Sequence, residues 1–177
     1  MIKRTLFTAA AALSLAGCAT YGDGVAASDD TITETVVMSP DHETLETLVV
    51  SAGLADTLSG AGPFTVFAPT DAAFNRLPAA IRTAAMQPQN RDMLRGVLTY
   101  HVVAGDVKAA ALTDMIRDGG GTATLTTLQG TTLRATVENG FVKLTDATGG
   151  SAFVETADID ASNGTIHSIN GVLMPRN

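Results

Sequence analysis

The sequence predicts an α+β domain whose first half is mainly helical and whose second half is an antiparallel sheet. In most of residues 40–118, apolar side chains recur three or four positions apart, as on one face of a helix. The run Gly119–Gly121 ends this pattern, and apolar and polar residues alternate after it, which is typical of strands. Asn139 and Gly140 separate two alternating stretches and form a two-residue hairpin signal, which predicts antiparallel pairing.

Residues 1–17 are predicted to be a signal peptide. Lys3 and Arg4 precede an apolar run at Leu6–Leu15, which is shorter than the roughly 20 residues that cross a bilayer. The run ends in Leu15–Cys18, read Leu-Ala-Gly-Cys, which resembles the bacterial lipoprotein box and makes Cys18 the predicted lipidation site and membrane anchor. It is the only cysteine, so no internal disulfide can form. The alternative is an ordinary signal peptide that ends near a cysteine.

Residues 18–35 are predicted to comprise this lipidated cysteine and a flexible tether. They contain few large apolar side chains, so they bury too little surface to offset the entropy of ordering. An alternative for the end of this segment is an edge strand at Thr31–Val37, because Thr and Val favour strands. Residues 36–177 then form one domain of the usual size for a single hydrophobic core.

Capping and breaking residues divide the domain into elements. The helices are predicted from Ser39 to Gly53, Thr70 to Pro78, Asn90 to Leu98 and Asp106 to Ile116, with a short strand at Thr65–Phe67. The later strands are predicted at Leu133–Val137, Val142–Leu144, Ser151–Thr156 and Thr165–Ile169, with a closing segment at Val172–Met174. Leu, Val, Ile and Ala must supply most of the core, because aromatic residues make up 5% of the chain and Trp is absent.

The charge of the chain argues against nucleic acid as a partner. The sequence carries 11 basic and 18 acidic residues, and loss of Lys3 and Arg4 with the signal peptide leaves 9 basic residues and a net charge of −9. Phosphate binding depends on clustered Lys and Arg. The sequence also contains no nucleophile elbow, phosphate-binding loop or dinucleotide-binding glycine motif. We therefore expect neither an enzyme nor a cofactor.

None of the three histidines is expected to be a metal ligand, and His101 and His167 are expected to be structural. His42 falls in the first turn of a predicted surface helix, where it would be solvated, whereas His101 and His167 lie among apolar residues and would be buried with backbone partners. No two histidines have metal-ligand spacing, and no cysteine is spare. The segment Asp158–Ser162 resembles the start of a calcium loop, but the Gly and the bidentate Glu that such a loop needs are missing. No metal site is predicted.

Three segments in order resemble the fasciclin (FAS1) family. They are Thr65–Phe74, read TVFAPTDAAF, then Leu98–Gly105, read LTYHVVAG, and finally Asn163–Leu173, read NGTIHSINGVL. The resemblance extends over roughly Val36 to Pro175, and three ordered matches are more specific than one. It implies a wedge-shaped β-sandwich or barrel with a helical layer on one side.

The resemblance also implies candidate partner-binding residues. Animal members of the family have a Tyr-His segment and an Asp-Ile pair linked to adhesion, and here these match Tyr100 and His101, and Asp158 and Ile159. The chain departs from the family at Asn170, where Asp is common, and at Thr165 and Ser168, where apolar residues are common.

The sequence therefore predicts a non-catalytic, lipid-anchored adhesion or interaction module of a bacterial cell envelope. Its partner would be an envelope or extracellular protein or polysaccharide, and the membrane would be reached through the N-terminal lipid. Ala19 stands where many inner-membrane lipoproteins have Asp, which favours an outer-membrane lipoprotein facing the periplasm or the cell surface. The alternative is a carrier for an apolar small molecule, such as a lipid or pigment, held between the helices and the sheet.

Overall fold

The computed structural model describes residues 29–176. The predicted signal peptide, the lipidation site at Cys18 and the tether up to residue 28 lie outside the described residues. The helical elements are α1 (Ile32–Val37), α2 (Glu43–Ala52), α3 (Ala55–Leu58), α4 (Asp71–Asn75), α5 (Ala79–Ala85), η1 (Pro88–Asn90), α6 (Arg91–Tyr100) and α7 (Ala109–Asp118). The strands are β1 (Phe64–Pro69), β2 (Val102–Ala104), β3 (Ala123–Thr126), β4 (Thr132–Glu138), β5 (Phe141–Thr145), β6 (Ser151–Ala161) and β7 (Gly164–Ile169).

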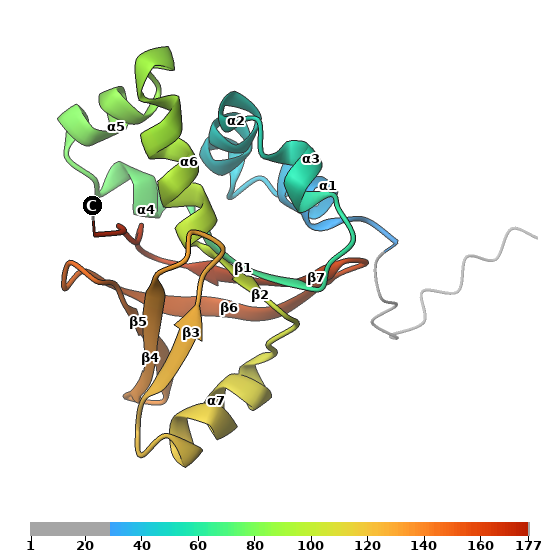
Figure 1. Cartoon of the computed structure of the whole chain (residues 1–177), viewed down its shortest axis with the longest axis vertical. Coiled ribbons are helices and arrows are strands. Elements are labelled where there is room, and N and C mark those ends of the chain that lie inside the picture. Colours follow the sequence, from blue (N-terminus) through green and yellow to red (C-terminus); the bar gives the residue numbers. More distant parts are fainter. Residues whose placement is uncertain (1–28, 177) are drawn as a thin grey trace, which may run out of the picture.

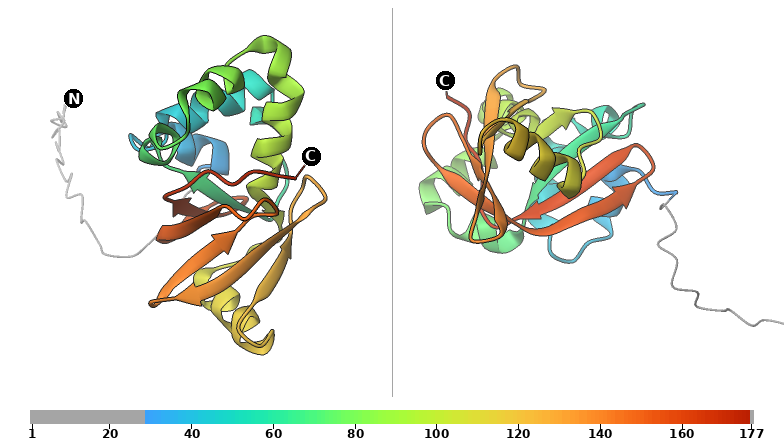
Figure 2. Two further views of the ribbon diagram at one scale, coloured as in Figure 1. Left: turned by 90° about the vertical axis from the view of Figure 1, so that its left-hand side faces the viewer. Right: turned by 90° about the horizontal axis from the view of Figure 1, so that it is seen from below.

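The strands form one curved sheet in the order β2-β1-β7-β6-β5-β4-β3. Figure 1 shows helices α1 to α6 on one side of β1 and β7, with α7 at the opposite end of the molecule. The left view of Figure 2 shows the same division, since β3 to β5 curve away from the helical layer. This arrangement confirms the predicted α+β class with a helical layer over a barrel-like sheet. None of the helices within residues 29–176 is long and apolar enough to span a bilayer.

The sheet separates two hydrophobic cores, because neighbouring strand residues face opposite sides. Val66 and Ile166 belong to the core under helices α1 to α6. Phe67 and Ile169, on the same two strands, belong to the core that α7 and strands β3 to β6 enclose. The helical layer and the barrel are therefore joined through both faces of β1 and β7.

The segment before the family motifs is a packed helix. Thr31 and Glu34 form a capping box at the start of α1, in which the Glu34 carboxylate accepts from the Thr31 backbone N–H at 2.8 Å. Ile32 and Val36 are buried in the first core. The tether prediction is thus wrong for residues 32–35, and the edge-strand alternative at 31–37 is wrong as well. Ile32 and Val36 lie four positions apart, so both face the core from one side of this short helix.

The N-cap of helix α2 is His42, three residues later than the predicted N-cap at Ser39. The helix spans Glu43–Ala52, and its C-cap Gly53 adopts a positive φ of 66°, which confirms the predicted end. His42 occupies the N-cap position without a side-chain cap, and the Asp71 carboxylate instead accepts from the Thr44 N–H at 2.8 Å. The expectation that His42 is solvated is wrong, because 5% of its surface is exposed.

The central helices have their N-caps at the residues that the sequence predicted as caps or breakers. Thr70 caps α4 by accepting from the Ala73 N–H, and Pro78 precedes α5. Asn90 stands at the N-cap of α6 as predicted, but its side-chain amide donates to the Ala84 carbonyl at 2.9 Å and caps no N–H of α6. Apolar residues on one face of α6 then pack on α2 and the sheet, which fixes the entry into β2.

The second half of the chain confirms the predicted hairpin. Asn139 and Gly140 both have positive φ, at 54° and 84°, and connect β4 to β5. Strands β6 and β7 are antiparallel, whereas β1 and β7 pair in parallel although about 100 residues separate them. The predicted closing segment, Val172–Met174, has no regular secondary structure; the Leu173 N–H bonds to His101 and the Met174 N–H to Asp146.

Candidate functional site

The first and last family-like segments lie side by side in the middle of the sheet. Strand β1 aligns with β7 in the register Phe64 to Gly164 through Pro69 to Ile169. A Cβ on Gly164 would come within 1.9 Å of the Phe64 carbonyl oxygen, so only glycine fits the close approach of the two strands at this point. These segments therefore form the centre of the fold.

Tyr100 ends α6 and is fully buried in the second core. Its phenol donates to the Thr132 carbonyl at 3.0 Å and accepts from the Ala147 N–H at 3.1 Å. Burial raises the pKa of Tyr100 above its ordinary value, so the phenol stays protonated. The side chain thus ties α6 to the β4 and β5 ends of the barrel and offers no free polar atom to a partner.

His101 follows directly and is also buried. Its Nδ1 lies 2.8 Å from the Val97 carbonyl, and its Nε2 accepts from the Leu173 N–H at 3.0 Å. The first contact requires a proton on Nδ1 and the second a lone pair on Nε2, so the ring is neutral. Burial lowers the pKa of His101 from 6.5 to about 4. The expectation of a structural histidine with backbone partners is confirmed.

Asp158 lies at an irregular point of β6 and has a positive φ of 58°. Its carboxylate accepts from the Ala109 N–H at 2.7 Å, at the first residue of α7. Its own N–H donates to Nδ1 of His167, whose Nε2 bonds to the Val107 carbonyl at 2.7 Å. Asp158 and His167 together hold the start of α7 against β6 and β7. Asp106, the predicted cap of this helix, instead accepts from the Thr165 hydroxyl at 2.5 Å.

The four candidate partner-binding residues do not share an environment. Tyr100 and His101 are buried, Asp158 is exposed, and Ile159 is half-buried and packs against the first core. The hydrogen bonds of Tyr100 and His101 run to other partners than those of Asp158. Their geometry supports two separate structural junctions. Of these four candidates, Asp158 alone presents a charged atom to solvent.

The sequence analysis did not predict the roles of two buried polar side chains, His42 and Asp146. His42 lies between two hydroxyls, with the Ser39 Oγ 2.8 Å from Nδ1 and the Ser168 Oγ 3.3 Å from Nε2. Asp146 is buried and accepts from the backbone of Gly150 and Met174 as well as from Thr148. Burial raises the pKa of Asp146, but these hydrogen bonds outweigh it and hold the pKa below 3.8. The signal for Asp146 was its place before Gly149–Gly150. Ser39 lies close to His42 in the sequence, but Ser168 lies 126 positions away, so the sequence did not indicate that His42 bridges two hydroxyls.

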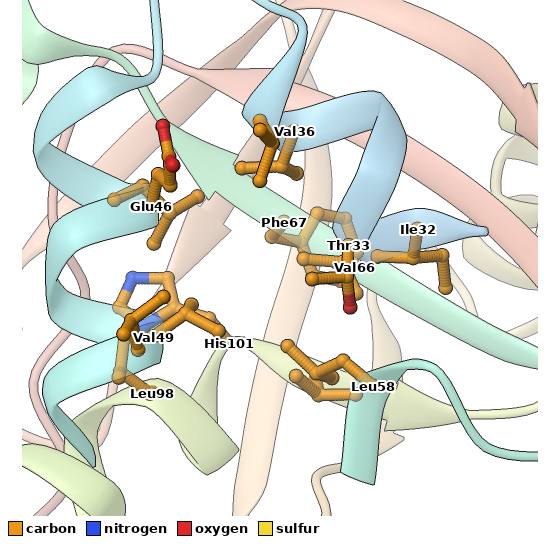
Figure 3. A pocket seen from close by; sticks show the side chains of 14 residues that line it. Ile32, Thr33, Val36, Glu46, Val49, Leu58, Val66, Phe67, Leu98 and His101 are labelled. Atoms are coloured by element: carbon orange, nitrogen blue, oxygen red, sulfur yellow. The ribbon is translucent and has the colours of Figure 1, made fainter. Parts of the chain in front are cut away.

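Two apolar grooves open beside His101 in the helical layer. One is enclosed by α1, α2, α6 and β1, and Figure 3 shows Val36, Val49, Val66 and Leu98 converging on it. The other lies between α4, α5 and α6. Their cavity volumes are about 30 and about 60 Å³, well below the roughly 150 Å³ of an apolar cavity that holds benzene. Among residues 29–176, no group of three or more His, Cys, Asp or Glu could hold a metal ion.

Comparison with solved structures places this fold in a known class. The structure titled as a FAS1 domain pair from the insect cell adhesion molecule fasciclin I superposes with a TM-score of 0.73 at 17% identity, covering 82% of this chain and 51% of that one. At this identity the likeness shows the fold, which is the FAS1 fold.

The sequence comparisons show the family itself. A family model described as the Fasciclin domain matches residues 40–175. The chain is 42% identical over 153 residues to Protein sll1483 of Synechocystis, covering 85% of this chain and 77% of that protein. It is 35% identical over 162 residues to Cell surface glycolipoprotein MPB83 of Mycobacterium bovis, covering 92% and 64%. The chain belongs to the fasciclin domain family, as its three motifs predicted.

Proposed function

We propose that this protein is a non-catalytic adhesion or interaction module of the cell envelope. The observation that carries this proposal is that three polar side chains of the family segments already have hydrogen-bond partners within the domain. The Tyr100 hydroxyl donates one hydrogen bond and accepts another, and both ring nitrogens of His101 and of His167 are bonded to other residues of the chain. A catalytic base or nucleophile needs a polar atom free to bond to a substrate, and the polar atoms of these three side chains are already bonded within the fold.

The relatives support an extracytoplasmic interaction role. Family members include a protein named as an insect cell adhesion molecule and one named as a cell surface glycolipoprotein. The latter alignment covers 92% of this chain. Together with the Leu-Ala-Gly-Cys segment, this supports a lipid-anchored form in which Cys18 carries the lipid and the domain stands at an outer membrane.

The anchor is tested by fractionating the host envelope. We expect the protein to remain with the membranes, and Cys18→Ser to release it into the soluble fraction with unchanged folding, because the domain itself has no bilayer-spanning helix among its described residues. Mass spectrometry should find a diacylglyceryl group on Cys18. A mature protein without added lipid would overturn the anchor and leave the fold unaffected.

The interaction role is tested with the released Cys18→Ser protein. Cosedimentation with envelopes from its own host should be saturable, and native mass spectrometry should give the bare protein mass, because the two apolar grooves are too small for a lipid or pigment. A stoichiometric added mass that persists would favour the carrier alternative. Non-saturable sedimentation would contradict adhesion.

A further inference from the structure

An open hollow of about 810 Å³ lies at the open end of the β4–β5 hairpin, where Tyr100 at the end of α6 bonds to Thr132 and Ala147. It is lined by two arginines, three threonine hydroxyls and the turn that follows β5: Thr132, Arg134, Thr145, Asp146, Ala147, Thr148, Gly149 and Arg176. Its volume is in the range of small-ligand sites.

The two arginines have no ion-pair partner within residues 29–176. The basic residues with carboxylate partners there are Lys108, Arg117 and Lys143. The side chains of Arg134 and Arg176 have no hydrogen bond or ring contact to a described residue. Both side chains are exposed, so their five N–H donors each face solvent or a ligand.

Asp146 also lines the hollow, but its carboxylate is already engaged. Its Oδ1 accepts from Thr148 and Gly150, and its Oδ2 accepts from the Met174 N–H at 2.9 Å. These donors stabilise its negative charge and fix the turn. The hollow therefore has two unpaired cations beside one carboxylate that the backbone has already satisfied.

The hollow continues into a row of hydroxyls across the sheet. The strand registers place Thr124, Arg134, Thr145 and Ser151 directly opposite one another on β3 to β6. With strands about 4.8 Å apart, this row is about 14 Å long, much longer than one phosphate or sulfate. Leu112 and Ile116 of α7 pack with Leu133 and Ala135, on the opposite face. Thr124, Arg134 and Ser151 of this row are exposed.

We propose that this surface binds an acidic polysaccharide that carries carboxylates, with Arg134 and Arg176 each pairing with a sugar carboxylate. A planar guanidinium matches a carboxylate through two parallel N–H···O bonds. The threonine and serine hydroxyls of the row can both donate to and accept from sugar hydroxyls. The inference rests on the proposed envelope-binding function and names the class of partner for it.

The experiment uses a galacturonic acid hexasaccharide and the neutral galactose hexasaccharide as matched probes, titrated into the Cys18→Ser protein by calorimetry. Salt of about 0.15 M screens charges more than about 8 Å apart, so distant acidic residues contribute little repulsion. We expect binding of the acidic probe alone. Arg134→Ala should weaken it about 10-fold or more, since a hydrogen bond to a charged group is worth that much, and the double change with Arg176→Ala should abolish it.

Two variants separate specific recognition from general charge. Arg95→Ala removes an exposed arginine on α6 and should change affinity less than about 2-fold, as surface charges outside a contact do. Arg134→Lys keeps the charge but loses bidentate geometry, and should fall between wild type and Arg134→Ala. An unchanged thermal midpoint in each variant shows intact folding.

Three results would overturn the proposal: no binding of the acidic probe, an equal loss in Arg95→Ala, or inorganic phosphate binding as tightly as the hexasaccharide. The last result would mean a simple anion site. Envelope binding that survives Arg134→Ala would leave the proposed function standing and reject this surface as its basis. If Arg134→Ala loses both hexasaccharide binding and envelope binding, the result would support the proposed function and this binding surface together.

Discussion

At the scale of single residues, the motif side chains determine how backbone segments meet. His101 holds the C-terminal segment through the Leu173 N–H, and His167 holds the segment before α7 through the Val107 carbonyl. Phe67 stacks on His167, with ring centroids 5.4 Å apart. The imidazole nitrogens of His101 and His167 have hydrogen-bond partners because an unpaired polar atom in the core costs free energy.

Tyr100→Phe should lower the free energy of unfolding. The change leaves the Thr132 carbonyl and the Ala147 N–H without the phenol, and an unsatisfied polar group costs about 1–3 kcal/mol. Urea denaturation checks this, with an unchanged m-value. Phe141→Leu, at a side chain that is 58% exposed, is the control and should stay within about 0.5 kcal/mol. Equal effects in the two variants would contradict the role of the phenol.

Stability should fall as the pH drops from 6.5 toward 4. The folded pKa of His101 is lowered from 6.5 to about 4, so in this window the unfolded chain binds a proton that the folded protein does not. A shift of this size corresponds to a loss of about 3 kcal/mol by the lower end of the window. Unfolding free energies measured across the window check it.

His101→Gln is the matched variant for this pH effect. Glutamine keeps one donor and one acceptor but does not titrate. Its unfolding free energy should vary less between pH 6.5 and 4 than that of the wild type. The same slope in both proteins would assign the pH dependence to other groups.

At the scale of elements, helix starts are satisfied from distant parts of the chain. The first turn of α2 is capped by Asp71, and the first residue of α7 by Asp158. Sequence reasoning placed these caps locally, at Ser39 and Asp106, because local caps are the commoner solution. Here β6 and the β1–α4 corner already lie beside those helix ends, so their carboxylates meet the free N–H groups.

Asp158→Ala should destabilise the protein by about 1–3 kcal/mol, through loss of a cap and the cost of a positive φ for alanine. Asp158→Asn should cost less, because asparagine tolerates that conformation and keeps an acceptor oxygen. Thermal unfolding and hydrogen exchange of the α7 amides measure the effect. If both variants leave α7 exchange unchanged, the cap has no structural weight and a partner-binding role for Asp158 gains support.

At the scale of the whole molecule, one residue joins the two ends of the domain. The Asn163 side chain accepts from the Ile32 N–H at 2.8 Å and donates to the Leu58 and Gly60 carbonyls at 2.7 and 2.9 Å. It lies just before β7, so the last strand is bonded to α1 and to the end of α3. The α1 segment therefore belongs to the domain.

Asn163→Ala should lower the unfolding free energy by about 2–4 kcal/mol, because it leaves several partly buried backbone groups unpaired. Asn163→Asp keeps the acceptor for Ile32 but loses both donors, and should fall between alanine and wild type. Chemical denaturation of the Cys18→Ser protein provides the comparison. Limited proteolysis should also cut near residue 38 faster in the alanine variant. An unaffected α1 would contradict this junction.

The sequence by itself determined the order and type of most elements and the family. Helical spacing, Gly53, Thr70 and the Asn139–Gly140 turn are local signals, because capping, φ preference and side-chain period act within a few residues. The parallel pairing of β1 with β7, the burial of His42 and the docking of α1 depended on the tertiary structure. Each requires residues tens to a hundred positions apart to meet. Such contacts form only when the two cores close around the sheet, so no local pattern records them.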